Sequence, residues 1–158
     1  MKNKSVKNNI VNIFMRLNIE YKEISHGPVY TMEEAENECN HTDKEGIKTL
    51  ALRTEKGEII LSILRGDHRL DFKKSSGVLG EHIKMADPED LKKMNVEIGG
   101  LAPFGYDTPL SVLYDSTIAE IEYVYINPGV NNKTFKLKSI DLLKAIGTWA
   151  KKVTPFCI

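Results

Sequence analysis

The sequence has no long apolar run, no excess of charge and almost no cysteine, and each absence argues against a class of protein. No segment approaches the ~18 consecutive apolar residues of a transmembrane helix, and the start, "MKNKSVKNNIVNIF", lacks the apolar core of a signal peptide. Lysine plus arginine number 22, as do aspartate plus glutamate. This balance disfavours a strongly basic nucleic-acid-binding module, although a local basic face stays open. We therefore expect a soluble, cytoplasmic protein that does not contact membranes.

The sequence motifs of several enzyme classes are absent as well. The two cysteines, Cys39 and Cys157, lie far apart and form no metal-ligand pattern with the four histidines. There is no Walker loop, no dinucleotide-binding fingerprint and no Gly-x-Ser-x-Gly nucleophile elbow. We therefore expect no metal, no cofactor and reduced cysteines.

The patterns that are present predict one α+β domain over residues 1–158. The length and the 41% hydrophobic content are those of a single globular domain. Helical periodicity or capping signals predict helices over 5–17, 32–39, 86–95 and 139–153, with Thr31, Asp87 and Ser139 as caps. Strand patterns cover 20–26, 109–115, 121–126 and 133–138, and 47–64 reads as a hairpin. This order favours a mostly antiparallel or mixed sheet with helices around it.

The segment "VEIGGLAPFGY", residues 96–106, fits neither a helix nor a strand. It holds Gly99, Gly100, Pro103 and Gly105 within a few positions. Glycine allows backbone angles that other residues avoid, and proline fixes its own angle and removes a donor. Such a segment either makes a tight turn or brings bare backbone close to a ligand.

Lys48 stands out because it lies at the start of an otherwise apolar strand, "GIKTLAL". By alternation it could simply occupy the solvent face of the hairpin. Beside a cleft, its compact cation would suit a phosphate or a carbonyl oxygen.

Four segments together resemble the YbaK/ProX family of prolyl-tRNA editing domains. They are "HGPVYTMEEAE" (26–36), "GIKTLALR" (46–53), "GGLAPFGY" (99–106) and "NPGVNNKTFKL" (127–137), in the order that the family shows. The resemblance implies an α/β fold with a curved, mixed, mostly antiparallel sheet or a partly open barrel surrounded by helices. It also implies hydrolysis of a wrongly attached small amino acid, such as alanine or cysteine, from tRNA(Pro). The partners it implies are the aminoacylated acceptor end and, as a candidate, a prolyl-tRNA synthetase.

Site residues follow from the same resemblance. Lys48 matches the family's functional lysine, which holds the terminal adenosine or its phosphate. The loop of Gly99, Gly100 and Pro103 would present backbone groups to the ester and the attacking water, which could stabilise an oxyanion. The positions expected to contact the substrate are His26, Tyr30, Thr31, Phe104, Gly105, Asn127 and Asn131. A turn role for His26 and a purely structural role for Asn131 stay open.

One position departs from the family pattern. Many alanine-editing members carry a histidine before a proline where this sequence has Asn127. Asparagine cannot titrate near neutral pH, so a mechanism with a histidine base at this place does not apply. Two alternatives therefore remain: a trans-acting aminoacyl-tRNA deacylase, or a non-catalytic module of the same fold that binds tRNA or a synthetase. The oligomeric state is open.

Overall fold

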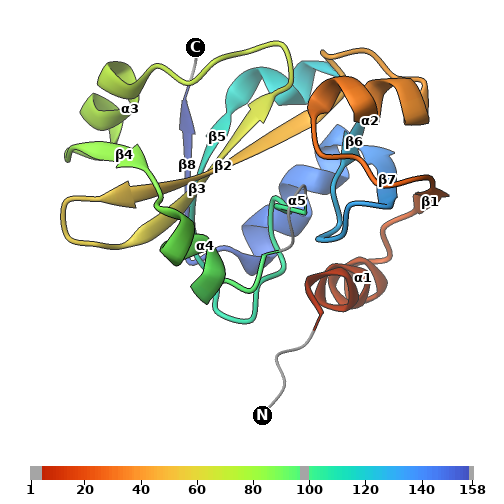
Figure 1. The fold of residues 1–158 in the computed structure, drawn as a ribbon, viewed down its shortest axis with the longest axis horizontal. Helices are drawn as coiled ribbons and strands as arrows, with labels where there is room; N and C mark the ends of the chain where they lie inside the picture. The colour runs from red at the N-terminus through yellow and green to blue at the C-terminus, as the bar shows by residue number, and fades with distance from the viewer. Residues whose placement is uncertain (1–4, 97–99, 157–158) are drawn as a thin grey trace.

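The computed structural model describes residues 5–96 and 100–156, which form a mixed α/β fold (Figure 1). Among these residues, the helices and the short 3-10 helix η1 alternate irregularly with eight strands. Their order is α1 (Val6–Leu17), β1 (Tyr21–Ser25), α2 (Met32–Cys39), β2 (Ile47–Thr54), β3 (Ile59–Arg65), α3 (Phe72–Leu79), β4 (Ile83–Met85), α4 (Pro88–Lys93), β5 (Ser111–Asp115), η1 (Ser116–Glu120), β6 (Tyr123–Ile126), β7 (Lys133–Lys138), α5 (Ser139–Trp149) and β8 (Lys152–Phe156).

The strands divide between two sheets. The larger has the order β4-β2-β3-β5-β8, and the smaller has the order β1-β7-β6. β2 runs antiparallel to β3 and β4, whereas β5 runs parallel to both β3 and β8. The smaller sheet is antiparallel throughout. The expected α/β class with a mixed sheet is confirmed, and the strands that the sequence predicts are shared between two sheets.

The predicted β2–β3 hairpin and most of the predicted helix starts are present. The Thr31 side chain accepts a hydrogen bond from the main-chain N–H of Glu34, and a capping box at Asp87 precedes Pro88. The sequence predicts Ser139 as a cap, but Ser139 is the first residue of α5 itself, and its hydroxyl donates to the carbonyl of Ile121. That bond ties α5 to the segment before β6.

A single hydrophobic cluster joins the two sheets. It includes Ile10 and Phe14 from α1, Phe135 from β7 and Trp149 from α5. In Figure 1, α5 lies between the two sheets, and α1 packs against the smaller one. Because helices and both sheets share this cluster, the edge where the sheets approach each other is held in a fixed position. Across the described residues, no helix is long and apolar enough to cross a membrane.

Candidate functional site

A cavity of about 760 Å³ opens where the two sheets meet. An isolated bridge between Gly46 and Tyr125 connects the start of β2 with β6, and both residues line the cavity. The volume suits a small organic ligand held by a few polar groups in a mainly apolar wall. The lining consists of Val29, Tyr30, Thr31, Ala35, His41, Gly46, Ile47, Lys48, Thr49, Pro88, Glu89, Leu91, Lys92, Val96, Leu101, Tyr125, Ile126, Asn127, Lys133 and Thr134.

Lys48 lies in this cavity, partly buried, and not on an open solvent face of the hairpin. Its Nζ donates a hydrogen bond to the main-chain carbonyl of His68, in the segment after β3. Burial lowers the pKa of Lys48, nearby Arg69 lowers it further, and Asp67 opposes the shift. An ammonium group has three N–H bonds, so it can hold the His68 carbonyl and a ligand oxygen at the same time.

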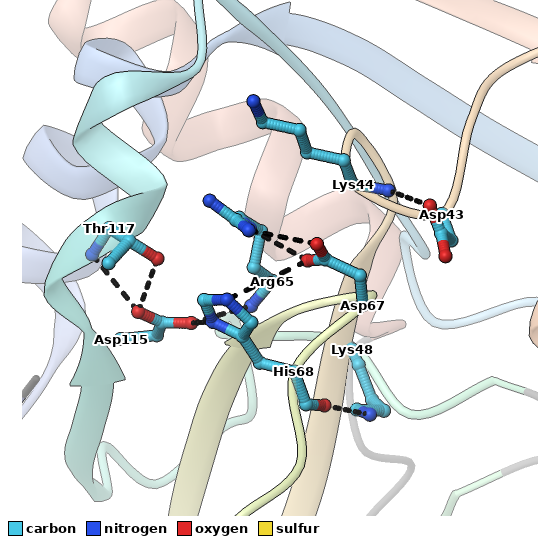
Figure 2. A network of polar contacts seen from close by, with 8 residues as sticks. All are labelled: Asp43, Lys44, Lys48, Arg65, Asp67, His68, Asp115 and Thr117. Atoms are coloured by element: carbon cyan, nitrogen blue, oxygen red, sulfur yellow. Dashed lines mark hydrogen bonds and ion pairs between the residues drawn. The ribbon is translucent and has the colours of Figure 1, made fainter. Parts of the chain in front are cut away.

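A network of polar contacts fixes the segment that holds Lys48 (Figure 2). The His68 ring places Nδ1 2.6 Å from Oδ2 of Asp115, which is fully buried at the end of β5. The same carboxylate accepts from the main-chain N–H of Arg65 and, through Oδ1, from the N–H and hydroxyl of Thr117. The Arg65 guanidinium makes two further bonds to Asp67, at 2.7 and 2.8 Å. The carbonyl that accepts from Lys48 is therefore part of a braced turn.

The pKa of Asp115 lies below its ordinary value despite its burial. Burial by itself raises this pKa, but hydrogen bonds from Thr117, His68 and the Arg65 main chain outweigh that effect. The carboxylate thus stabilises the folded state above the unfolded pKa of about 3.9, and this contribution is lost as the pH falls towards the folded pKa.

We expect the stability difference between the wild type and Asp115→Asn to be largest near neutral pH and to shrink below about pH 4. Asparagine cannot carry the charge that the network stabilises, so only the wild type loses this contribution on acidification. Urea unfolding of both proteins between pH 7 and pH 3 measures this difference in the free energy of unfolding. Asp43→Asn is the control, because Asp43 is exposed and its carboxylate accepts from the main-chain N–H of the adjacent Lys44. A difference that stays constant down to pH 3 would contradict the expectation.

Tyr30 and Thr31 both line the cavity, whereas His26 is not among the lining residues. The His26 Nδ1 is 2.6 Å from the carbonyl of Gly27, and a carbonyl can only accept, so this nitrogen carries the proton. Its Nε2 forms a hydrogen bond of 2.8 Å with the hydroxyl of Thr134. Thr134 lines the cavity, so His26 orients a wall residue.

The loop of residues 100–106 is anchored in the core. Phe104 is fully buried and its ring centroid lies 5.9 Å from that of Phe14. Gly105 has a φ of +99°, and a Cβ there would lie 2.7 Å from Ile10 Cγ1. Within residues 100–106 the cavity-lining residue is Leu101, and Gly100, which is buried directly before it, is not among the lining residues. Pro103 is buried, and neither it nor Phe104 nor Gly105 is among the cavity-lining residues.

Gly99, the first glycine of the predicted catalytic loop, lies outside the described residues. Its role stays a prediction, as do those of the other loop residues.

Asn127 and Asn131 take different positions. Asn127 lines the cavity, and its Oδ1 accepts from the main-chain N–H of Gly129 at 2.8 Å. Asn131 is not among the lining residues, but its main-chain carbonyl accepts from the N–H of Val29 at 2.8 Å. The segment after β6 is therefore fastened to the segment before α2, which forms one wall of the cavity.

The sequence patterns do not point to several of the cavity-lining residues. His41 stacks on Tyr125 with 4.4 Å between ring centroids, and its Nδ1 donates to the Thr42 carbonyl. Helix α4 supplies another wall, and a bond of 3.0 Å from Arg53 to the buried Asp90 holds it against β2. A histidine directly after a helix has no motif of its own, and the amphipathic pattern of α4 gives no sign of what it faces.

Comparisons with known proteins agree on one family. The model of the aminoacyl-tRNA editing domain family matches residues 26–145. The prolyl-tRNA editing protein ProX of Acetoanaerobium sticklandii is 29% identical over 137 residues, which cover 82% of this chain and 84% of that protein. A proline–tRNA ligase of Thermodesulfovibrio yellowstonii is 33% identical over 125 residues, but these are 78% of this chain and only 21% of the ligase. A solved structure described as a candidate trans-editing enzyme for prolyl tRNA synthetase aligns over 98% of both chains with a TM-score of 0.78 at 23% identity, a likeness of fold.

Proposed function

Because this chain belongs to the aminoacyl-tRNA editing domain family, we propose that it is a trans-acting deacylase that hydrolyses mischarged tRNA(Pro). The observation that carries the proposal is the Lys48 ammonium inside a largely apolar cavity of about 760 Å³. This volume is large enough for an aminoacylated nucleoside. The proposal treats residues 1–158 as one editing domain.

In this reaction water attacks the ester carbonyl that joins the amino acid to the terminal ribose. The ester C–O bond breaks, one proton of the water goes to the ribose oxygen, and the amino acid is released as a carboxylate with the other proton passing to solvent. Lys48 would hold a phosphate or carbonyl oxygen of the substrate while the His68 carbonyl fixes its position. Main-chain N–H groups of the loop around Gly100 would stabilise the negative charge that develops on the carbonyl oxygen.

The residue at position 127 shapes the mechanism. Asn127 cannot act as a base, and its Oδ1 already accepts from Gly129. The attacking water would therefore be activated by substrate groups, such as the terminal ribose hydroxyl, and by the fixed cation. A substrate with a cysteine side chain could instead use its own thiol against the ester.

The second candidate function is a non-catalytic module that binds tRNA or a synthetase. The observation that favours it is the same Asn127, which removes the titratable side chain present in many alanine-editing relatives. The cavity with Lys48 favours a site that takes in the aminoacylated end of tRNA, because a module that only docked on a synthetase would need no lysine held inside a cavity.

We expect the purified protein to hydrolyse alanyl- or cysteinyl-tRNA(Pro) and to spare prolyl-tRNA(Pro). Exclusion of the prolyl ester should be steric, since a small pocket for the amino-acid side chain rejects larger side chains more easily than smaller ones. The measurement is loss of radiolabelled amino acid from alanyl-, cysteinyl-, seryl- and prolyl-tRNA(Pro). Rapid hydrolysis of the prolyl ester would contradict an editing role, and binding without hydrolysis of any ester would favour the non-catalytic module.

A further inference from the structure

The smaller sheet has one face buried and one face largely open. Successive side chains of a strand point to opposite sides. On the inner side, Val124, Ile126, Phe135 and Leu137 join the hydrophobic core. The opposite side carries Lys22 of β1, Tyr123 and Tyr125 of β6, and Lys136 and Lys138 of β7, which we call the lysine–tyrosine face.

The register of the strands gathers these side chains into two adjacent rows. Lys136 of β7 lies opposite Lys22 on one side and Tyr125 on the other. Lys138 lies opposite Tyr123. The Lys136 Nζ lies 5.0 Å from the centroid of the Tyr123 ring and 5.6 Å from that of Tyr125, as a cation does over an aromatic face. Lys22, Lys138 and Tyr123 are exposed.

Positive charge dominates this face although the protein as a whole is neutral. The only carboxylate within the three strands, all of them described, is Glu23, which lies on the opposite side and pairs with Lys7 of α1 at 2.8 Å. Glu45, whose main-chain carbonyl accepts from the N–H of Tyr125, accepts through its side chain from the N–H and hydroxyl of Thr42 at 3.1 and 2.9 Å and also interacts electrostatically with Lys136. Lysines interleaved with exposed aromatic rings form the surface that single-stranded nucleic acid uses, with phosphates on the cations and bases on the rings.

The lysine–tyrosine face is continuous with the cavity. Tyr125 belongs to both, and Thr134, one row along β7, also lines the cavity. RNA whose 3′ end enters the cavity must continue outward past residues that line it, and Tyr125 is one of these lining residues. Next to the cavity, His41 stacks on Tyr125 of the face, and Cys39 at the end of α2 contacts Thr134.

We propose that the lysine–tyrosine face binds the RNA strand that leads into the cavity, namely the unpaired acceptor end of tRNA and the phosphates next to it. This inference rests on the proposed function for the identity of the RNA. It adds a surface, formed by Lys22, Tyr123, Tyr125, Lys136 and Lys138, on which the strand lies. The lysines would contact successive phosphates, and Tyr123 would stack on a base.

The test uses the full chain and an RNA hairpin that carries no amino acid and reproduces an acceptor stem with an unpaired CCA end. Its dissociation constant is measured by fluorescence anisotropy at several salt concentrations. We expect the triple variant Lys22→Gln, Lys136→Gln and Lys138→Gln to bind roughly tenfold more weakly at low salt. The slope of log K against log salt should fall by about 2, because each phosphate that a lysine no longer neutralises removes ~0.7 from the slope.

A matched control removes three exposed lysines elsewhere, with Lys56→Gln, Lys73→Gln and Lys74→Gln, from the β2–β3 turn and α3. In Figure 1 these elements lie at the end of the molecule away from the smaller sheet. Tyr123→Ala should weaken binding about tenfold and Tyr123→Phe should leave it unchanged, because phenylalanine keeps the stacking surface.

The outcomes separate this inference from the proposed function. Equal salt slopes in the two triple variants, or no RNA binding by the wild type, would overturn the inference. If the wild type hydrolyses mischarged tRNA but the face variants bind RNA as it does, only the inference fails. If the face variants lose RNA binding while the wild type hydrolyses no ester, the inference stands and the deacylase proposal fails.

Discussion

Lys48→Ala is expected to lower the rate of deacylation roughly 100- to 1,000-fold while the protein stays folded. This is the range typical of removing one charge-stabilising donor from an enzyme site. A hydrogen bond to a charged group is stronger than one between neutral groups, and the partly desolvated cavity weakens screening by water. Lys48 donates to the His68 main-chain carbonyl, whereas the bond to Asp115 comes from the His68 ring, so the substitution leaves the Asp115 network in place.

The experiment compares single-turnover rates and melting curves of Lys48→Ala with those of Lys152→Ala. Lys152 is exposed in β8 and serves as a lysine in a strand outside the cavity. Lys48→Arg adds a second test, because a planar guanidinium cannot replace a compact ammonium held against one carbonyl. Turnover that stays at the wild-type level in a folded Lys48→Ala protein would remove Lys48 from the mechanism.

The position of Lys48 shows why the sequence could not settle its role. Alternation along β2 allows a solvent-facing lysine equally well. The second sheet determines the surroundings of Lys48, because the Gly46–Tyr125 bridge brings β6 beside the start of β2, and these residues line the same cavity as Lys48. That bridge joins segments about 80 residues apart in sequence, and no local pattern encodes it. The family resemblance, and not the spacing, is what points to this lysine.

Local signals predict most of the elements, but the helix predicted over 139–153 ends at Trp149, and Lys152 and Val153 belong to strand β8. Thr31, Asp87 and the β2–β3 turn carry such signals, and the elements they mark are present. The sequence patterns do not predict helix α3 or strand β8. The first holds Gly77 in the middle of a short helix, and the second holds a proline and pairs with β5 by a long-range parallel contact.

For the segment 96–106 the sequence leaves two interpretations open, and the described residues support a structural role for part of it, while contact of its backbone with a ligand stays a prediction. From Ala102 to Tyr106 it is structural: Tyr106 donates its hydroxyl to the Ala102 carbonyl, and Asn9 of α1 donates to the Gly105 carbonyl. At its other side Leu101 lines the cavity, and Gly100 is its buried neighbour in sequence. Substitutions at Gly105 would therefore report on folding, whereas Gly100 is the described position at which to test a contribution to the reaction.

We expect Gly100→Ala to reduce deacylation on the order of 100- to 1,000-fold, provided that the main-chain N–H groups here face the ester. Gly100 is buried directly before the cavity-lining Leu101, and we expect an added methyl group in this buried position to crowd its neighbours. A shift of about 1 Å in a catalytic group is enough to cost two decades in rate. Gly99→Ala belongs in the same series as a test of the family's loop position.

The measurement is turnover per folded molecule, taken with the melting curve of each variant. Gly77→Ala is the matched control, because a Cβ at this helical position meets nothing within 4 Å. It should raise stability by up to about 1 kcal/mol and leave turnover unchanged, since alanine is the better helix former. If Gly100→Ala lowers the melting temperature but keeps full turnover, the loop is only a connection. If turnover falls while the melting curve is retained, backbone groups of the loop take part in the reaction, as the proposed mechanism requires in the absence of a titratable side chain at Asn127.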